Sequence, residues 1–271
     1  MKPRPSRVAK MRLDVLIHES GLATSREAAR RLIMAGGVLV NDSPASKAGA
    51  MVLVDSTIRV KAKPRFVSRG GEKLVAALKA FDIHPLARDC ADVGASSGGF
   101  TDCLLKMGAR LVYAIDVGYG QLDWGLRQDK RVVVMERTNA RYIASLPTLV
   151  DLAVIDVSFI SLKLILPAVQ LWLKSEGQVV ALVKPQFEAG RGKVGKGGVI
   201  RDSKVHAEVL ETIIGFSEAN GFVVNGLIPS PLRGPSGNIE FLLFLVRQHH
   251  HPESRAAEMI RLALESSFNI R

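Results

Sequence analysis

A glycine loop between an apolar run and a helical pattern constrains this chain more than any other sequence feature. The loop, Asp92-Val93-Gly94-Ala95-Ser96-Ser97-Gly98-Gly99-Phe100, is followed on the next apolar run by Asp116. Glycines let a backbone approach a ligand, a helix N-terminus offers free N–H groups, and an acid about 20 residues further on can bind a ribose diol. Because the spacing is not G-x-G-x-x-G, the stretch indicates either an adenosyl cofactor or a plain strand-to-helix turn.

Four charged residues lie beside apolar segments, where charge is usually avoided: Lys73, Asp156, Lys184 and Glu240. Asp156 follows the run 152–155 and Lys184 follows the run 178–183. Both should therefore emerge at the carboxyl edge of a parallel sheet, where open α/β sheets bind ligands. Glu240 taken alone would be a surface carboxylate at a strand end.

The periodicity predicts an α/β fold, a doubly wound Rossmann-like sheet with an edge hairpin and a small N-terminal αβ domain. Ser68 is expected to cap a helix over 71–81. Further helices are expected near 98–107, 121–127, 161–173, 203–219 and 253–266, and strands near 89–93, 110–115, 132–135, 152–155, 178–183, 222–228 and 240–246. The expected boundaries are a basic tail at 1–9, an αβ module at 10–62, a linker at 63–68 and the large domain at 69–271.

The N-terminal module carries most of the positive charge. Residues 1–70 hold 14 Lys/Arg against 5 Asp/Glu, whereas the whole chain has a formal net charge of +11. Helices are expected over 12–18 and from Thr24 or Ser25 to Met34, and strands over 38–42 and 57–61. Arg26 and Arg30 lie one turn apart on a helix, with Lys47 in the following loop, which suits a polyanion backbone. The alternative is a merely solvated basic face.

Five ordered motifs resemble the TlyA-type ("hemolysin A") methyltransferases, and the large domain is also similar to FtsJ-type ribose 2′-O-methyltransferases. The motifs are Ser68-Arg69-Gly70-Gly71-Glu72-Lys73-Leu74, the loop 92–100, Ile155-Asp156-Val157-Ser158-Phe159, Val183-Lys184-Pro185-Gln186-Phe187-Glu188 and Gly237-Asn238-Ile239-Glu240-Phe241. Residues of the N-terminal module, from Arg12-Leu13-Asp14 to Asp55, resemble the RNA-binding domain of ribosomal protein S4.

The resemblance implies methylation of a cytidine ribose in ribosomal RNA by S-adenosylmethionine, with ribosomal RNA and ribosomal subunits as partners. It implies a catalytic tetrad in which Lys184 deprotonates the hydroxyl or stabilises the alkoxide, with Lys73, Asp156 and Glu240 around it. The expected cofactor contacts are Asp92, Gly94, Ala95, Ser96, Gly98, Gly99, Asp116, Glu136, Asn139 and Phe159. Phe159 as plain core is the alternative.

RNA contacts are expected from Arg12, Arg26, Arg30, Lys47, Arg65, Arg69, Arg191, Lys193 and Lys196. The last three belong to a glycine-rich loop, 190–198, that either closes over the target nucleotide or stays a disordered surface loop until RNA binds.

Composition excludes several other classes. Cys90 and Cys103 form no disulfide framework, which favours a reducing compartment, and no stretch reaches the ~20 apolar residues of a membrane span. We therefore expect a cytoplasmic protein without a membrane association. His249-His250-His251 has no evident partner, so no metal site is expected. The alternatives are a non-catalytic RNA-binding assembly factor and, less in keeping with the sequence, a membrane-lytic protein.

Overall fold

The computed structural model describes residues 9–34, 36–60, 64–248 and 254–267, and the side chains of Arg191 and Lys196 are also left undescribed. Most of the expected basic tail and the histidines at 249–251 therefore lie outside the described residues. The chain divides into two compact units, Met1–Pro64 and Arg65–Arg271. Each unit has its own core.

The first unit combines two helices with short strands. The helices are α1 (Leu13–Glu19) and α2 (Arg26–Met34), and Ser25 Oγ accepts a hydrogen bond from Ala28 N at 3.1 Å, as expected of a cap. Strands β2 (Val38–Val40), β3 (Ser43–Pro44) and β5 (Ile58–Val60) form one sheet, and β1 (Lys10–Arg12) pairs with β4 (Met51–Leu53). The core consists of Leu13, Ile17, Ala29, Ile33 and Val38.

A seven-stranded sheet organises the second unit, in the order β11-β12-β10-β9-β6-β7-β8. The five strands from β10 to β8 run parallel, and β12 runs antiparallel to both of its neighbours. This is the expected doubly wound sheet with an edge hairpin. The strands are β6 (Asp89–Val93), β7 (Leu111–Ile115), β8 (Val132–Met135), β9 (Val150–Ile155), β10 (Leu173–Val183), β11 (Phe222–Pro229) and β12 (Phe241–Arg247).

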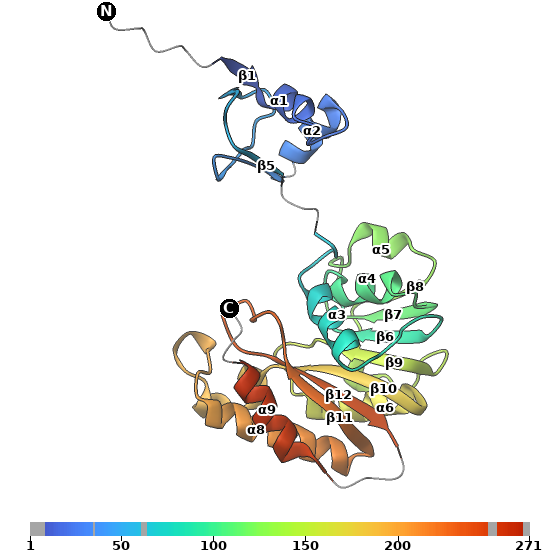
Figure 1. Cartoon of the computed structure of the whole chain (residues 1–271). Coiled ribbons are helices and arrows are strands. Elements are labelled where there is room, and N and C mark those ends of the chain that lie inside the picture. The colour runs from blue at the N-terminus through green and yellow to red at the C-terminus, as the bar shows by residue number, and fades with distance from the viewer. Residues whose placement is uncertain (1–8, 35, 61–63, 249–253, 268–271) are drawn as a thin grey trace, which may run out of the picture. The chain divides into compact units, whose positions relative to one another are not determined.

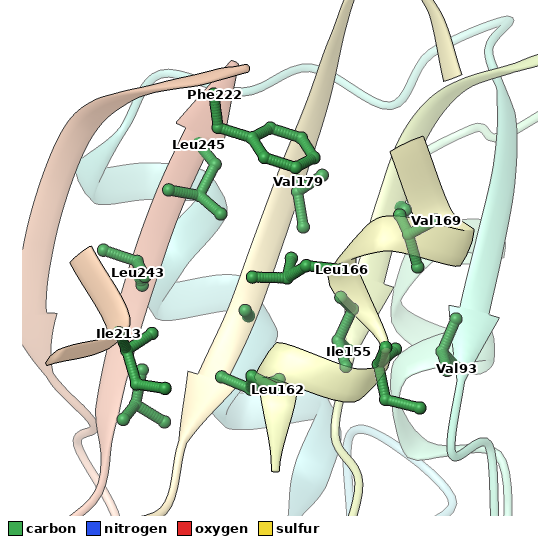
Figure 2. Close-up of a cluster of buried hydrophobic side chains, with 14 of the residues drawn as sticks. Val93, Ile155, Leu162, Leu166, Val169, Val179, Ile213, Phe222, Leu243 and Leu245 are labelled. Carbon is green, nitrogen blue, oxygen red and sulfur yellow. The ribbon is translucent and has the colours of Figure 1, made fainter. Parts of the chain in front are cut away.

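Helices cover both faces of this sheet (Figure 1). On one face lie α3 (Gly70–Ala80), α4 (Gly99–Lys106) and α5 (Trp124–Gln128). On the other lie α6 (Leu166–Trp172), α8 (Ser203–Ala219) and α9 (Ala256–Ser267). Figure 2 shows that face's core, where Leu166 and Val169 of α6 meet Ile155 and Val179 of the central strands. The short elements are α7 (Pro185–Glu188) and the 3₁₀ turns η1 (Ala140–Tyr142), η2 (Leu162–Leu164), η3 (Arg191–Lys193) and η4 (Lys196–Gly198).

Two local predictions in this region were wrong. Ser68 does not cap α3 with its side chain: the helix begins at Gly70, and the Ser68 carbonyl accepts the Gly71 N–H at 3.2 Å. The expected linker also extends too far, because the second unit begins at Arg65 and Phe66 is buried in its core. Gly71 permits this packing, since a Cβ there would lie 2.3 Å from Phe66 Cγ.

Candidate active site

The glycine loop after β6 turns sharply against the neighbouring strands. Gly94 has φ +86°, and a Cβ at this position would lie 2.4 Å from the Asp156 carbonyl oxygen. Gly98, with φ +93°, is the N-cap of α4. Both conformations favour glycine, and the result is a backbone cradle that leaves room for a ligand at the start of a helix.

Asp116, after β7, closes one side of this cradle. Its Oδ2 accepts from Ser96 N at 2.8 Å and its Oδ1 from Gly118 N at 2.6 Å. These bonds fix the carboxylate against the glycine loop while leaving lone pairs on both oxygens. Glu136, after β8, shares a small cavity with Asp116, where its Oε1 accepts from Gly120 N at 2.9 Å.

Two lysine–carboxylate ion pairs lie at the carboxyl edge of the sheet. Lys184 Nζ lies 2.5 Å from Asp156 Oδ1, and Lys73 Nζ lies 2.5 Å from Glu240 Oε2. Asp156 and Lys184 follow the strands β9 and β10, which lie side by side and run parallel (Figure 1), so both residues emerge at the carboxyl edge of the sheet as expected. Both lysine side chains are nearly buried, which strengthens their attraction to the carboxylates relative to an exposed pair.

A cavity of about 280 Å³ joins the glycine loop to these pairs. Its walls include three of the four charged residues, namely Lys73, Asp156 and Lys184, but not Glu240, which is 1% exposed and contacts Lys73. The remaining lining residues are Ser68, Arg69, Gly70, Gly94, Ala95, Ser96, Ser97, Gly99, Phe100, Ser158, Leu232 and Pro235. A backbone cradle beside an acid, opening into a pocket with an ammonium group, fits an adenosyl methyl donor at one end and a hydroxyl acceptor at the other.

Asp92 does not line the cavity, and its side chain makes contacts inside the protein instead. It is fully buried, its Oδ2 accepts from Thr101 Oγ1 at 2.6 Å, and its Oδ1 has no partner among the described residues. Burial raises the pKa of Asp92 to about 7, against the opposing effect of the Thr101 hydrogen bond. Asp92 thus connects β6 to α4 beneath the cradle.

Phe159 and Asn139 were both expected to contact the cofactor. Phe159 is 90% exposed with φ +63°, so the core alternative is wrong, and its ring lies 4.8 Å from that of Phe187. Asn139 caps η1 by accepting from Arg141 N and lines neither the main cavity nor the small one beside Asp116.

Sequence reasoning assigned no role to Ser158, although the residue lies in a quoted motif. Lys184 Nζ donates to Ser158 Oγ at 2.9 Å, and both residues line the cavity. Ser158 thus fixes the lysine in a second direction, beside its ion pair with Asp156. Its position two residues after Asp156 was the available signal.

The basic residues expected to contact RNA fall into separate groups. In the first unit, Arg12 and Arg26 reach the buried carboxylate of Asp14 at 2.9 and 3.6 Å, while Arg30 and Lys47 are exposed. The hydrogen bond from Arg12 holds the Asp14 pKa below its usual range.

In the second unit, Arg69 lines the cavity and Arg65 lies over the Phe66 ring. Lys193 forms an ion pair with Glu208. The side chains of Arg191 and Lys196 lie outside the described part of the structure.

Residues 66–247 match the family described as FtsJ-like methyltransferase, and residues 11–58 match the S4 domain. The fold and the site accordingly define a methyl-transferring enzyme. The chain belongs to the FtsJ-like methyltransferase family, with an S4 domain at its N-terminal end. The expected family and fold class are confirmed.

Close relatives support this assignment. The chain is 54% identical over 240 residues to the Bacillus subtilis protein YqxC, whose name describes it as an rRNA methyltransferase. The matched region covers 87% of this chain and 85% of YqxC. It is 46% identical over 243 residues to the 16S/23S rRNA (cytidine-2′-O)-methyltransferase TlyA of Mycobacterium tuberculosis, covering 88% and 91% of the two chains. A Streptococcus thermophilus protein of solved structure, named as a hemolysin, is 45% identical in sequence. Its structure matches with a TM-score of 0.72, covering 96% of this chain and 98% of that one.

Across the described residues, no helix combines the length and the apolar character that crossing a bilayer requires. Over the same part of the chain, no group of three or more His, Cys, Asp or Glu side chains is placed to hold a metal ion.

Proposed function

We propose that this protein transfers a methyl group from S-adenosylmethionine to the 2′-hydroxyl of a cytidine ribose in ribosomal RNA. The observation that carries the proposal is the Lys184–Asp156 pair on the wall of the cavity that the glycine loop also lines. The name of the 46% identical relative TlyA supports the choice of cytidine and ribosomal RNA.

In this proposal the glycine loop and Asp116 hold the cofactor, which supplies an electrophilic methyl group when bound. Backbone N–H groups of the loop meet its methionine end and the Asp116 carboxylate its ribose, with Glu136 towards the adenine side. Asp92 acts indirectly, by fixing α4 to β6 through Thr101. Phe159, exposed next to the cavity-lining Ser158 in the chain, is the further cofactor contact in this proposal.

In its neutral amine form, Lys184 takes the proton of the ribose hydroxyl as the oxygen accepts the methyl group, and the ammonium that results is held by Asp156. Its Nζ is fixed from two directions, by Asp156 Oδ1 at 2.5 Å and Ser158 Oγ at 2.9 Å, so an incoming hydroxyl meets a group with a defined direction. General base catalysis contributes roughly 10²–10⁴-fold, and alignment of the hydroxyl with the methyl group supplies much of the remainder. Lys73, held by Glu240, lines the same cavity and stabilises negative charge there.

The S4 domain and the basic residues of the second unit would bind the RNA. Arg30 and Lys47 are exposed on the first unit, and Arg69 lies at the cavity. Ribosomal subunits are the proposed partners, and the protein is proposed to act in the cytoplasm. A purely RNA-binding role does not explain the two ion pairs at the cavity. Burying a lysine costs desolvation free energy, so such pairs are weak evidence of a role in stability alone.

The test is single-turnover transfer of labelled methyl groups from S-adenosylmethionine to ribosomal RNA and isolated subunits, followed by mapping of the methylated ribose. Lys184→Ala should bind cofactor and RNA but lose transfer by at least ~10²-fold. Lys184→Arg should not restore it, because a guanidinium stays protonated and has a planar shape.

The matched control is Lys174→Ala. Lys174 is the second residue of the same strand, β10, and pairs with Asp151 at 2.7 Å, yet it is absent from the cavity wall. Its loss should leave transfer unchanged. Transfer by Lys184→Ala at the wild-type rate, or absence of cofactor binding by the wild-type protein even with RNA present, would refute the proposed function.

A further inference from the structure

The glycine-rich segment between α7 and α8 (residues 189–200) is poorly fixed by its own backbone. Gly190, Gly197 and Gly198 have positive φ, and apart from bonds inside the turns η3 and η4 the described backbone bonds within the segment are Lys193 N to Gly190 O at 3.3 Å and Gly198 N to Gly195 O at 3.1 Å. Glycine-rich backbone has high conformational freedom, so the position of such a segment depends on what fixes its ends.

Glu188 fixes the first end. Its Oε2 accepts from Ser161 Oγ at 2.6 Å and its Oε1 accepts from Leu162 N at 2.8 Å. Glu188 lies four residues after Lys184, and Ser161 five residues after Asp156. The contact therefore joins the two chain segments whose lysine and aspartate form one ion pair of the site. Burial raises the pKa of Glu188, so a neutral amide should fit the same place.

Asn238 fixes the second end. The residue is 2% exposed, its Oδ1 accepts from Ile200 N at 2.9 Å, and its Nδ2 donates to Gly198 O at 2.8 Å. Both ends of the amide are thus used on the glycine-rich segment. Asn238 precedes Glu240 by two residues, so this contact joins the segment to the strand end that carries the other ion pair.

We infer that Glu188 and Asn238 are positioning residues that hold the two ends of the glycine-rich segment against the motifs carrying Asp156 and Glu240. The inference rests on the proposed function and adds two residues to it. Neither lines the cavity, so each acts through the ion pair to which its motif is joined. The segment and the charged groups then keep one relative geometry, and misplacement of about 1 Å in such a site can cost 10²-fold in rate.

The test measures kcat, RNA KM and cofactor Kd of the full chain, with ribosomal RNA as substrate. Asn238→Ala and Glu188→Ala should lower kcat by about 10- to 100-fold, with cofactor Kd within about twofold of wild type, because the cradle at 94–99 is untouched. Glu188→Gln should restore kcat, because its amide accepts from Leu162 N and donates to the Ser161 hydroxyl. Asn238→Asp should not, because it removes the donor to the Gly198 carbonyl.

Ser217→Ala is the matched control. It removes a buried hydrogen bond, from Ser217 Oγ to Ile213 O at 2.8 Å, near the C-terminal end of α8 and outside both motifs. Thermal unfolding and circular dichroism establish the folded fraction. If Glu188→Ala does not fold, Ser161→Ala, which removes only the hydroxyl, replaces it.

Three results would overturn the inference: kcat within about twofold of wild type in the alanine variants, an equal fall in Ser217→Ala, or a raised RNA KM with unchanged kcat. Wild-type activity, measured first, tests the proposed function separately.

Discussion

Replacing Asp92 by Asn should change how the stability of the second unit depends on pH. The carboxyl group is fully buried with one unpartnered oxygen, and burial raises its pKa to about 7. A group with a raised folded-state pKa adds stability below its unfolded pKa of about 3.9, and that stability is lost as pH rises through the folded value.

The size of the effect follows from the two pKa values. A difference of about three pH units corresponds to about 4 kcal/mol, of which roughly 2–3 kcal/mol is lost between pH 5 and pH 8. Asp92→Asn removes the titration. The free energy of unfolding of the variant, relative to wild type, should therefore increase by that amount over the same interval.

Urea unfolding at pH 5, 6.5 and 8 measures this difference, with Asp151→Asn as control. Burial would raise the Asp151 pKa, but hydrogen bonds from Lys174 and the Asp89 N–H outweigh it and the pKa is lowered. Asp151 is therefore ionised throughout the interval in both states, and its replacement should cost the same free energy at each pH. A pH-independent effect of Asp92→Asn would refute the reasoning.

Three further predictions concern the cofactor cradle and the RNA surface. Asp116→Ala should weaken S-adenosylmethionine binding by about 1–3 kcal/mol through a lost charged hydrogen bond, and calorimetry giving unchanged affinity would place the ribose elsewhere. Gly94→Ala should destabilise the second unit by roughly 2 kcal/mol or more, measured by urea unfolding, since its φ is +86° and its Cβ would lie 2.4 Å from a carbonyl oxygen. Arg30→Glu with Lys47→Glu should weaken RNA binding and flatten its salt dependence, and an unchanged slope in a filter-binding titration would assign the phosphate contacts to the second unit.

The sheet was predictable because its strands are buried on both faces. Buried parallel strands form nearly continuous apolar runs, and the charge that ends each run marks the carboxyl edge, as Asp156 and Lys184 show. The grouping of those two residues in one tetrad came from the family resemblance. The short strands β1 and β4 were missed: β1 (KMR) has a single apolar residue, and β4 (MVL), although apolar, is only three residues long and mostly exposed.

The sequence did not reveal which residues contact one another within the site. The pattern did not show that Lys73 pairs with Glu240 whereas Lys184 pairs with Asp156, since pairing depends on how β12 enters the sheet. It also did not show that Phe159 is exposed, because an aromatic residue after a strand is equally compatible with core. The role of Ser68 was misjudged because its backbone carbonyl, not its hydroxyl, meets the helix start.

The position of β12 between β10 and β11 has a consequence for the order in which a growing chain acquires its site. β11 is synthesised before β12 but has β12 as its neighbour in the sheet, so it cannot join until residues 241–247 are in place. The same insertion delivers Glu240 to Lys73 across 167 positions of sequence. Until then Lys73 is a lysine without its carboxylate, and a nascent chain that already holds the glycine loop and the S4 domain still lacks a complete site. The complete site therefore forms only after β12 has been synthesised, and a chain cut short before β12 keeps the cofactor cradle without the second ion pair.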